Sequence, residues 1–226
     1  MGEAFGQMLP IAIAIAVSPA PIAVAVLMLV SARPRANGLA FAFGWITGIA
    51  ALGALVLALA GTAGASDDDG DPSTWVSLLQ LGFGVVLLLL ALKSWRGRPT
   101  AGDDVPVPAW IGAMHSFTPL KAAAVGVGLS AVNPKNVLFV IAAAATEAQA
   151  GLSAGRQVLV WAIFTGVATL GVAVPLAIYF TLGERAPPLL DRLNVWLISN
   201  KTTVMAVLCL IIGATLIGNA IGGLSA

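Results

Sequence analysis

Two short motifs contain residues that the middle of a membrane-spanning helix normally avoids. They are Ser18, Pro19 and Pro21 in the segment AVSPAPIAV, and Asn133, Pro134, Lys135 and Asn136 in the segment AVNPKNVLF. A cation at the centre of a bilayer costs about 2.5–3.5 kcal/mol on insertion scales, so it normally has a partner. An amine beside the start of a helix is suited to binding an anion. We therefore expect these residues to form the substrate-binding site.

Each motif also predicts that a new helix starts inside an apolar segment. Serine and asparagine are favoured N-cap residues, and proline is favoured at the first helical position. Proline removes a backbone donor and disrupts the turn before it, so we expect free carbonyls around residues 14–15 and 129–130. The positive ends of the two half-helices would then point at the membrane centre from opposite sides.

The sequence supplies no carboxylate to neutralise Lys135. No aspartate or glutamate lies in the middle of an apolar segment, and Glu147 lies about 18 Å further along a helix, at the segment's edge. Three explanations stay open: burial keeps the amine uncharged, freed carbonyls hold it, or an anionic ligand pairs with it. A proton relay through carboxylates is not expected. Without a nucleotide-binding motif, energy would come from an ion gradient or from the substrate's own gradient.

The composition indicates an all-α integral membrane protein. Of the 226 residues, 59% are hydrophobic and 9% are charged, whereas soluble domains contain about 25% charged residues. A single cysteine and a single histidine exclude a disulfide framework and a multi-histidine metal site, so we expect no cofactor and no metal. The net charge of +1 gives no reason to expect nucleic-acid binding.

Six apolar segments are long enough to cross a membrane, which takes about 20 residues. They cover residues 5–31, 38–61, 75–95, 118–145, 157–183 and 203–224. Apart from Arg156 and Lys135, every lysine and arginine lies in or beside the first, third or fifth link. The positive-inside rule makes these links cytoplasmic and both termini extracytoplasmic, so the acidic tract at 67–71 is expected to be a solvated outer loop.

The two motifs predict an internal repeat. A shift of 115 residues aligns Ala16 and Val17 with Ala131 and Val132, and Pro19 with Pro134. Because each half would contain three spans, the halves have opposite orientations, as in many secondary transporters with broken helices. We expect two inverted three-helix repeats, residues 1–95 and 118–226, joined by a cytoplasmic link at 96–117. Helices 1 and 4 would be broken at the midplane.

Two glycine motifs predict close packing between helices. Gly44 and Gly48 in the second span, and Gly218 and Gly222 in the sixth, have the small-xxx-small spacing. We expect them to pack inside the chain or at the interface of a homodimer. His115 could carry a proton, but its place at the end of the third link favours an interfacial histidine.

The layout and the motifs resemble the lysine exporter (LysE) superfamily. The features shared with this superfamily are six spans, a Ser-Pro-x-Pro motif in the first span and an Asn-Pro-Lys motif in the fourth. The segments SPAPIAVAVLML and AVNPKN, the length and the acidic loop are most similar to the branch of sulfolipid- and glycopeptidolipid-addressing (Sap or GAP) proteins of actinobacteria. Ala20 stands where small-molecule exporters of the superfamily have the glycine of Pro-Gly-Pro. The resemblance implies an outward-acting transporter of large polar-headed lipids in the plasma membrane. It carries over all the motif residues except Asn136, which we add as a neighbour of the break.

The leading hypothesis is therefore a transporter or flippase that moves an anionic, polar-headed lipid across the plasma membrane by alternating access. One alternative is an exporter of amino acids or other small metabolites, whose substrate could be a small anion. Another is a non-catalytic membrane subunit of a lipid-export machine. A hydrolase that pairs Ser18 with Lys135 is conceivable. We do not expect an enzyme, because neither serine nor lysine has a further catalytic partner in the sequence.

Overall fold

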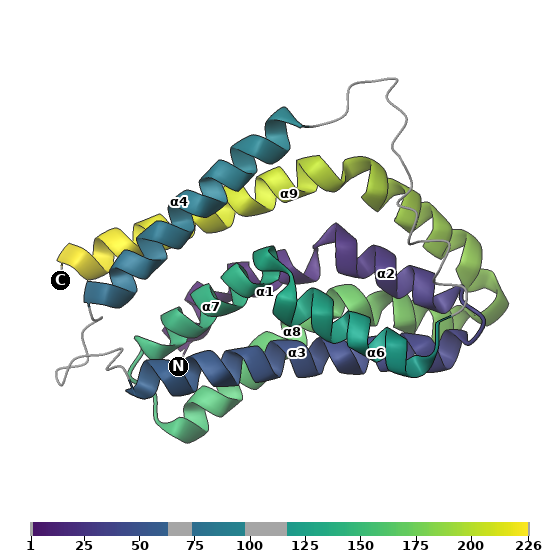
Figure 1. Ribbon diagram of the computed structural model, residues 1–226, viewed down its shortest axis with the longest axis horizontal. Helices are drawn as coiled ribbons and strands as arrows, with labels where there is room; N and C mark the ends of the chain where they lie inside the picture. Colours follow the sequence, from purple (N-terminus) through teal and green to yellow (C-terminus); the bar gives the residue numbers. More distant parts are fainter. Residues whose placement is uncertain (1, 63–73, 98–116, 226) are drawn as a thin grey trace.

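The computed structural model describes residues 2–62, 74–97 and 117–225, and within these ranges all regular structure is helical (Figure 1). The elements are α1 (Gly2–Ala16), α2 (Pro19–Leu29), α3 (Pro34–Thr62), α4 (Thr74–Arg96), α6 (Pro119–Val127), the π-helix η2 (Gly128–Val132), α7 (Pro134–Ala148), α8 (Ala154–Leu182), the short 3-10 helix η3 (Gly183–Arg185) and α9 (Ala186–Ser225). The acidic tract at 67–71, His115 and most of the link at 96–117 lie outside the described residues.

The predicted multi-pass helical architecture is confirmed. Four helices, α3, α4, α8 and α9, are each long and apolar enough to cross a membrane, and two bent helix pairs raise the number to six. Helix α9 begins earlier than the predicted sixth span, at Ala186 rather than at 203. As a result, Arg192 and Lys201 lie on a helix and not in a loop.

Both predicted helix breaks are present. Helices α1 and α2 meet at 48° around Ser18, and the helix formed by α6 and η2 meets α7 at 60° around Asn133. In each case a proline, Pro19 or Pro134, is the first residue of the second half-helix. The bends are consistent with this placement, because the proline ring disfavours the helical conformation in the residue before it, and Ser18 and Asn133 are both extended.

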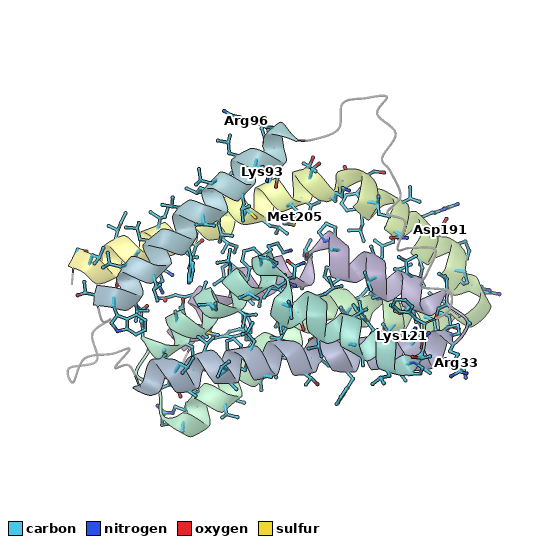
Figure 2. All side chains as sticks on the ribbon, viewed as in Figure 1. Arg33, Lys93, Arg96, Lys121, Asp191 and Met205 are labelled. Carbon is cyan, nitrogen blue, oxygen red and sulfur yellow. The ribbon has the colours of Figure 1, made fainter. Side chains whose placement is uncertain are left out.

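The long helices α4 and α9 form a pair along one side of the molecule (Figure 1). These two helices share the most extensive contact between any two described elements. Gly84 and Gly213 permit it, since a Cβ atom on either glycine would lie 2.9 Å from the other's carbonyl oxygen. Both termini lie toward the same end, and Arg33 and Lys121 lie together at the opposite end (Figures 1 and 2). Arg33 and Lys121 come from the first link and the start of the fourth span.

Glycines also bring α3 against the fourth span, which gives the predicted close packing a partner. A Cβ atom on Gly44 would lie 2.1 Å from the carbonyl oxygen of Ala123, and one on Gly48 would lie 1.9 Å from Ser130 Oγ. A Cβ atom on Gly218 or Gly222 would meet nothing within 4 Å among the described residues outside its own helix turn. Internal packing is thus confirmed for the first motif, and the homodimer stays a prediction for the second.

Candidate functional site

The break in the first span places Ser18 at the N-cap of α2. Its backbone is extended (φ −60°, ψ 122°), and its side chain is 1% exposed. The hydroxyl does not cap the helix. It accepts a hydrogen bond of 2.5 Å from the Nζ atom of Lys135, which belongs to the other broken span. The N-cap position was predicted, whereas a contact between Ser18 and Lys135 was considered only for the hydrolase alternative.

The break in the fourth span has the larger bend angle, and a π-turn directly precedes it. In η2 the N–H of Asn133 donates to the carbonyl of Gly128, five residues back, at 3.0 Å. Asn133 caps α7 as predicted, since its Oδ1 accepts the backbone N–H of Lys135 at 3.2 Å. Single π-turns of this kind are frequent at functional sites.

Asn136 satisfies one of the carbonyls that the break sets free. Its Nδ2 atom donates to the oxygen of Leu129 at 2.7 Å, and the side chain is 1% exposed. Leu129 is one of the residues at which a free carbonyl was predicted. The Oδ1 atom of Asn136 is buried and has no partner among the described residues. Asn136 therefore holds the broken backbone and leaves one acceptor at the site.

Replacing Asn136 with alanine should destabilise the protein by about 1–3 kcal/mol, because the carbonyl of Leu129 would stay buried without a donor. Asn200→Ala is the matched control. Asn200 Nδ2 makes the same kind of bond, 2.9 Å to the carbonyl of Trp196, but in exposed surroundings where water can replace it. Thermal unfolding in detergent would compare the two variants. Equal losses would contradict the bracing role of Asn136.

The described partners of the Lys135 amine are all uncharged. Besides Ser18, its Nζ atom lies 3.5 Å from the Sδ atom of Met205 and 5.5 Å from the centre of the Phe139 ring. No carboxylate contacts the amine in the described parts of the chain. None of its described bonds goes to a freed carbonyl, so that explanation for the lysine is wrong. The ring and the thioether leave the ammonium short of an anionic partner.

Six of the seven predicted site residues line one cavity of about 430 Å³. They are Ser18, Pro19, Pro21, Asn133, Lys135 and Asn136. Pro134 does not line it, because its ring lies on the exposed side of the break. The structure therefore brings both motifs, 115 residues apart, to a single site.

Helix α9 supplies a wall of the cavity that was not predicted. Its stripe consists of Leu197, Ile198, Lys201, Thr202 and Met205, and Ser94 of α4 adds a hydroxyl. The spacing of this stripe is that of one helix face. It was missed because residues 184–202 were assigned to a link, where no face is defined.

The cavity is amphipathic. Polar groups gather at the two helix breaks, and apolar side chains of α2 (Ala23, Val24 and Leu27) face those of α9 across the remaining space. Lys201 is a second cation in the lining, and it is exposed. Within the described ranges no group of three or more histidine, cysteine, aspartate or glutamate residues could hold a metal ion. The arrangement can bind an anionic group that carries an apolar part.

Comparison with known families adds one finding. The family model described as Sap, sulfolipid-1-addressing protein, matches residues 8–222. The match includes both helix breaks and all the residues that line the cavity. Neither the curated proteins nor the solved structures gave a match.

Proposed function

Because the chain belongs to the Sap family of sulfolipid-1-addressing proteins, we propose that it exports an anionic, polar-headed lipid across the plasma membrane. A sulfated glycolipid is the substrate that the family description favours. The observation that carries the proposal is the cavity in which Lys135 lies beside an apolar wall and has no carboxylate partner among the described residues. A lipid with an acidic headgroup has both of the chemical parts that this cavity offers to bind.

Lys135 is the residue that we assign to the headgroup. A hydrogen bond from an ammonium to a sulfate, phosphate or carboxylate is roughly twice as strong as one between neutral groups. The positive ends of α2 and α7 add to the attraction. Their backbone donors add less, because Pro19, Pro21 and Pro134 lack an N–H group. The side chain of Lys135 therefore supplies most of the selectivity for an anion, with Lys201 as a second contact.

The rest of the cavity suits the apolar part of the substrate. Its volume of about 430 Å³ holds a headgroup and the base of the acyl chains, but not a whole glycolipid. Its walls are formed by α2 and α9, which are separate elements packed side by side. We place the acyl chains in the bilayer, which they reach between these two helices.

Alternating access by two inverted repeats, residues 1–95 and 118–226, is the mechanism that we propose. Three features support the repeat: both first helices are broken, both third helices (α4 and α9) pair, and each break packs on a glycine of the other half. Those glycines are Gly48 at Ser130 and Gly171 at Ala16. The cavity lies toward the end that carries the basic links. If that end is cytoplasmic, the structure is the inward-facing state, and the termini are outside.

Reconstituted vesicles test the proposal. Purified protein should move headgroup-labelled sulfated galactosylceramide from one leaflet to the other, and should move the unsulfated lipid much more slowly. Vesicles loaded with amino acids serve as the comparison. Faster efflux of lysine or another amino acid, with no movement of lipid, would establish the metabolite exporter instead. Lipid movement that requires a co-purifying protein would establish the role of a subunit in an export machine.

The bond between Lys135 and Ser18 favours one further candidate, a serine hydrolase with a lysine base. The backbone at Ser18 supplies no free N–H group for an oxyanion hole. The N–H of Ser18 is bonded to the carbonyl of Ile15, at 3.2 Å, and Pro19 has no N–H to donate. A serine-reactive phosphonate that labels Ser18 in the wild type but not in Lys135→Met would establish the hydrolase. Absence of labelling would rule it out.

A further inference from the structure

Glu147 is a buried carboxyl group that the proposed site does not use. Its side chain is 0% exposed, and both of its oxygens lack a hydrogen-bond partner among the described residues. It lies in the last turn of α7, about 18 Å along the helix from Lys135. From the sequence it was placed at the edge of the span and given no role.

An ionised Glu147 would be strongly disfavoured in these surroundings. A buried carboxylate without hydrogen bonds or a counter-charge is far more costly than the neutral acid. The C-terminal end of α7 carries partial negative charge and adds to the repulsion. The group can therefore be buried in this conformation only as the uncharged acid.

No cation on the described parts of the helices that α7 packs against changes this balance. Arg156, which follows the turn after α7, is exposed and makes no described bond to either oxygen of Glu147. Helix α7 packs mainly against α1, α3 and α4. The charged residues of α3 and α4 are Arg35, Lys93 and Arg96, all at the ends of those helices far from Glu147. On α1 the charged residue is Glu3, an acid whose side chain is outside the described set.

A polar seam beside Glu147 joins α4 to α7. Gln80 of α4 donates to Thr146 Oγ1 at 3.3 Å and to Gln149 Oε1 at 2.9 Å. Its own Oε1 atom, the side-chain Nε2 atom of Gln149 and the hydroxyl of Ser77 are buried and have no partner in the described part of the chain. Such a seam can be hydrated when the two helices separate, since each of these groups can bond to water. Separation of α4 from α7 would thus bring water to the end of α7 at which Glu147 is buried.

We propose that Glu147 is a proton-binding site, which must be protonated for the α4–α7 end of the molecule to close. Opening this end hydrates the carboxyl group and releases its proton to the surrounding water. The closed form binds one more proton than the open form, so raising the pH favours opening. The assignment of this end to the outer face, where the proton would be exchanged, rests on the proposed function. Proton binding itself does not.

Infrared spectroscopy of the purified protein tests the protonation state directly. Near neutral pH the wild type should show the carbonyl stretch of a protonated carboxylic acid. This band should vanish in Glu147→Gln, move in Glu147→Asp, and stay in the control Asp191→Asn, which removes an exposed acid from α9. A wild-type spectrum without the band, or a band that survives in Glu147→Gln, overturns the proposal.

Hydrogen exchange tests the link to opening. After correction for intrinsic rates, protection of the amides at 142–149 should fall about tenfold per pH unit once the open form has lost its proton. Glu147→Gln should stay protected with no such slope, whereas Asp191→Asn should keep the wild-type slope. A flat wild-type profile, or a slope retained in Glu147→Gln, overturns the proposal. Neither measurement needs transport, so a failure of lipid transport in vesicles would count only against the proposed function.

Discussion

Replacing Lys135 with methionine should strongly weaken the binding of sulfated lipid while leaving the fold intact. The substitution removes the amine that contacts Ser18 and Met205 and keeps a flexible apolar side chain of similar length. Losing a charge-assisted hydrogen bond costs about 1.5–3 kcal/mol, or roughly 10- to 150-fold in affinity. Without lipid, the variant should be at least as stable as the wild type, because it no longer buries an amine that has no carboxylate partner.

Ligand-dependent thermal stabilisation measures this effect. A lipid at 100 times its dissociation constant stabilises the folded state by about 2.7 kcal/mol. Sulfated galactosylceramide should therefore raise the melting temperature of the wild type clearly more than that of Lys135→Met, and the unsulfated lipid should raise neither strongly. Lys201→Met should lose less of the stabilisation by sulfated lipid, because Lys201 is exposed and screened. Lys121→Met should keep all of this stabilisation. Undiminished stabilisation of Lys135→Met by the sulfated lipid would refute the role of Lys135.

The helix breaks and the spans could be predicted because their causes are local. Proline after a good N-cap residue ends one helix and starts another whatever surrounds it, and this holds at both Pro19 and Pro134. The spans follow from the length of apolar runs. The early start of α9 could not be predicted in this way. Its first turns carry charged residues such as Arg192, which hydropathy alone assigns to a loop.

The contacts within the site depended on tertiary structure. Nothing local to Ser18 predicts that its hydroxyl accepts a bond from Lys135 and leaves the helix uncapped. Nor does the sequence predict that Lys201 lines the same cavity, because this depends on how α9 lies against α2. Glu147 shows the same limit. Its burial depends on the helices that pack over the end of α7, and this packing cannot be predicted from the hydropathy of the sequence.

Gly171 gives the second large effect, because it allows α8 to lie directly against the break in the first span. A Cβ atom at this position would lie 1.8 Å from the carbonyl oxygen of Ala16, the last residue of α1. Relief would require a shift of backbone, since the oxygen cannot rotate away as a side chain could. Gly171→Ala should therefore lower the free energy of unfolding by at least about 1–3 kcal/mol, the range typical of overpacking. It should also weaken lipid binding, because displacing Ala16 moves the neighbouring Ser18.

Gly166→Ala, five residues earlier in the same helix, is the matched control. Nothing lies within 4 Å of a Cβ atom there, so alanine gains about 0.5–1 kcal/mol of helix propensity and meets no obstacle. The two variants differ only in what the added methyl group meets, and their melting temperatures should move in opposite directions. Sulfated lipid should stabilise Gly166→Ala as it does the wild type, and Gly171→Ala less. Equal stability of the two variants would show that α8 does not hold the break, and that the geometry at Ser18 is fixed by α1 and α2 alone.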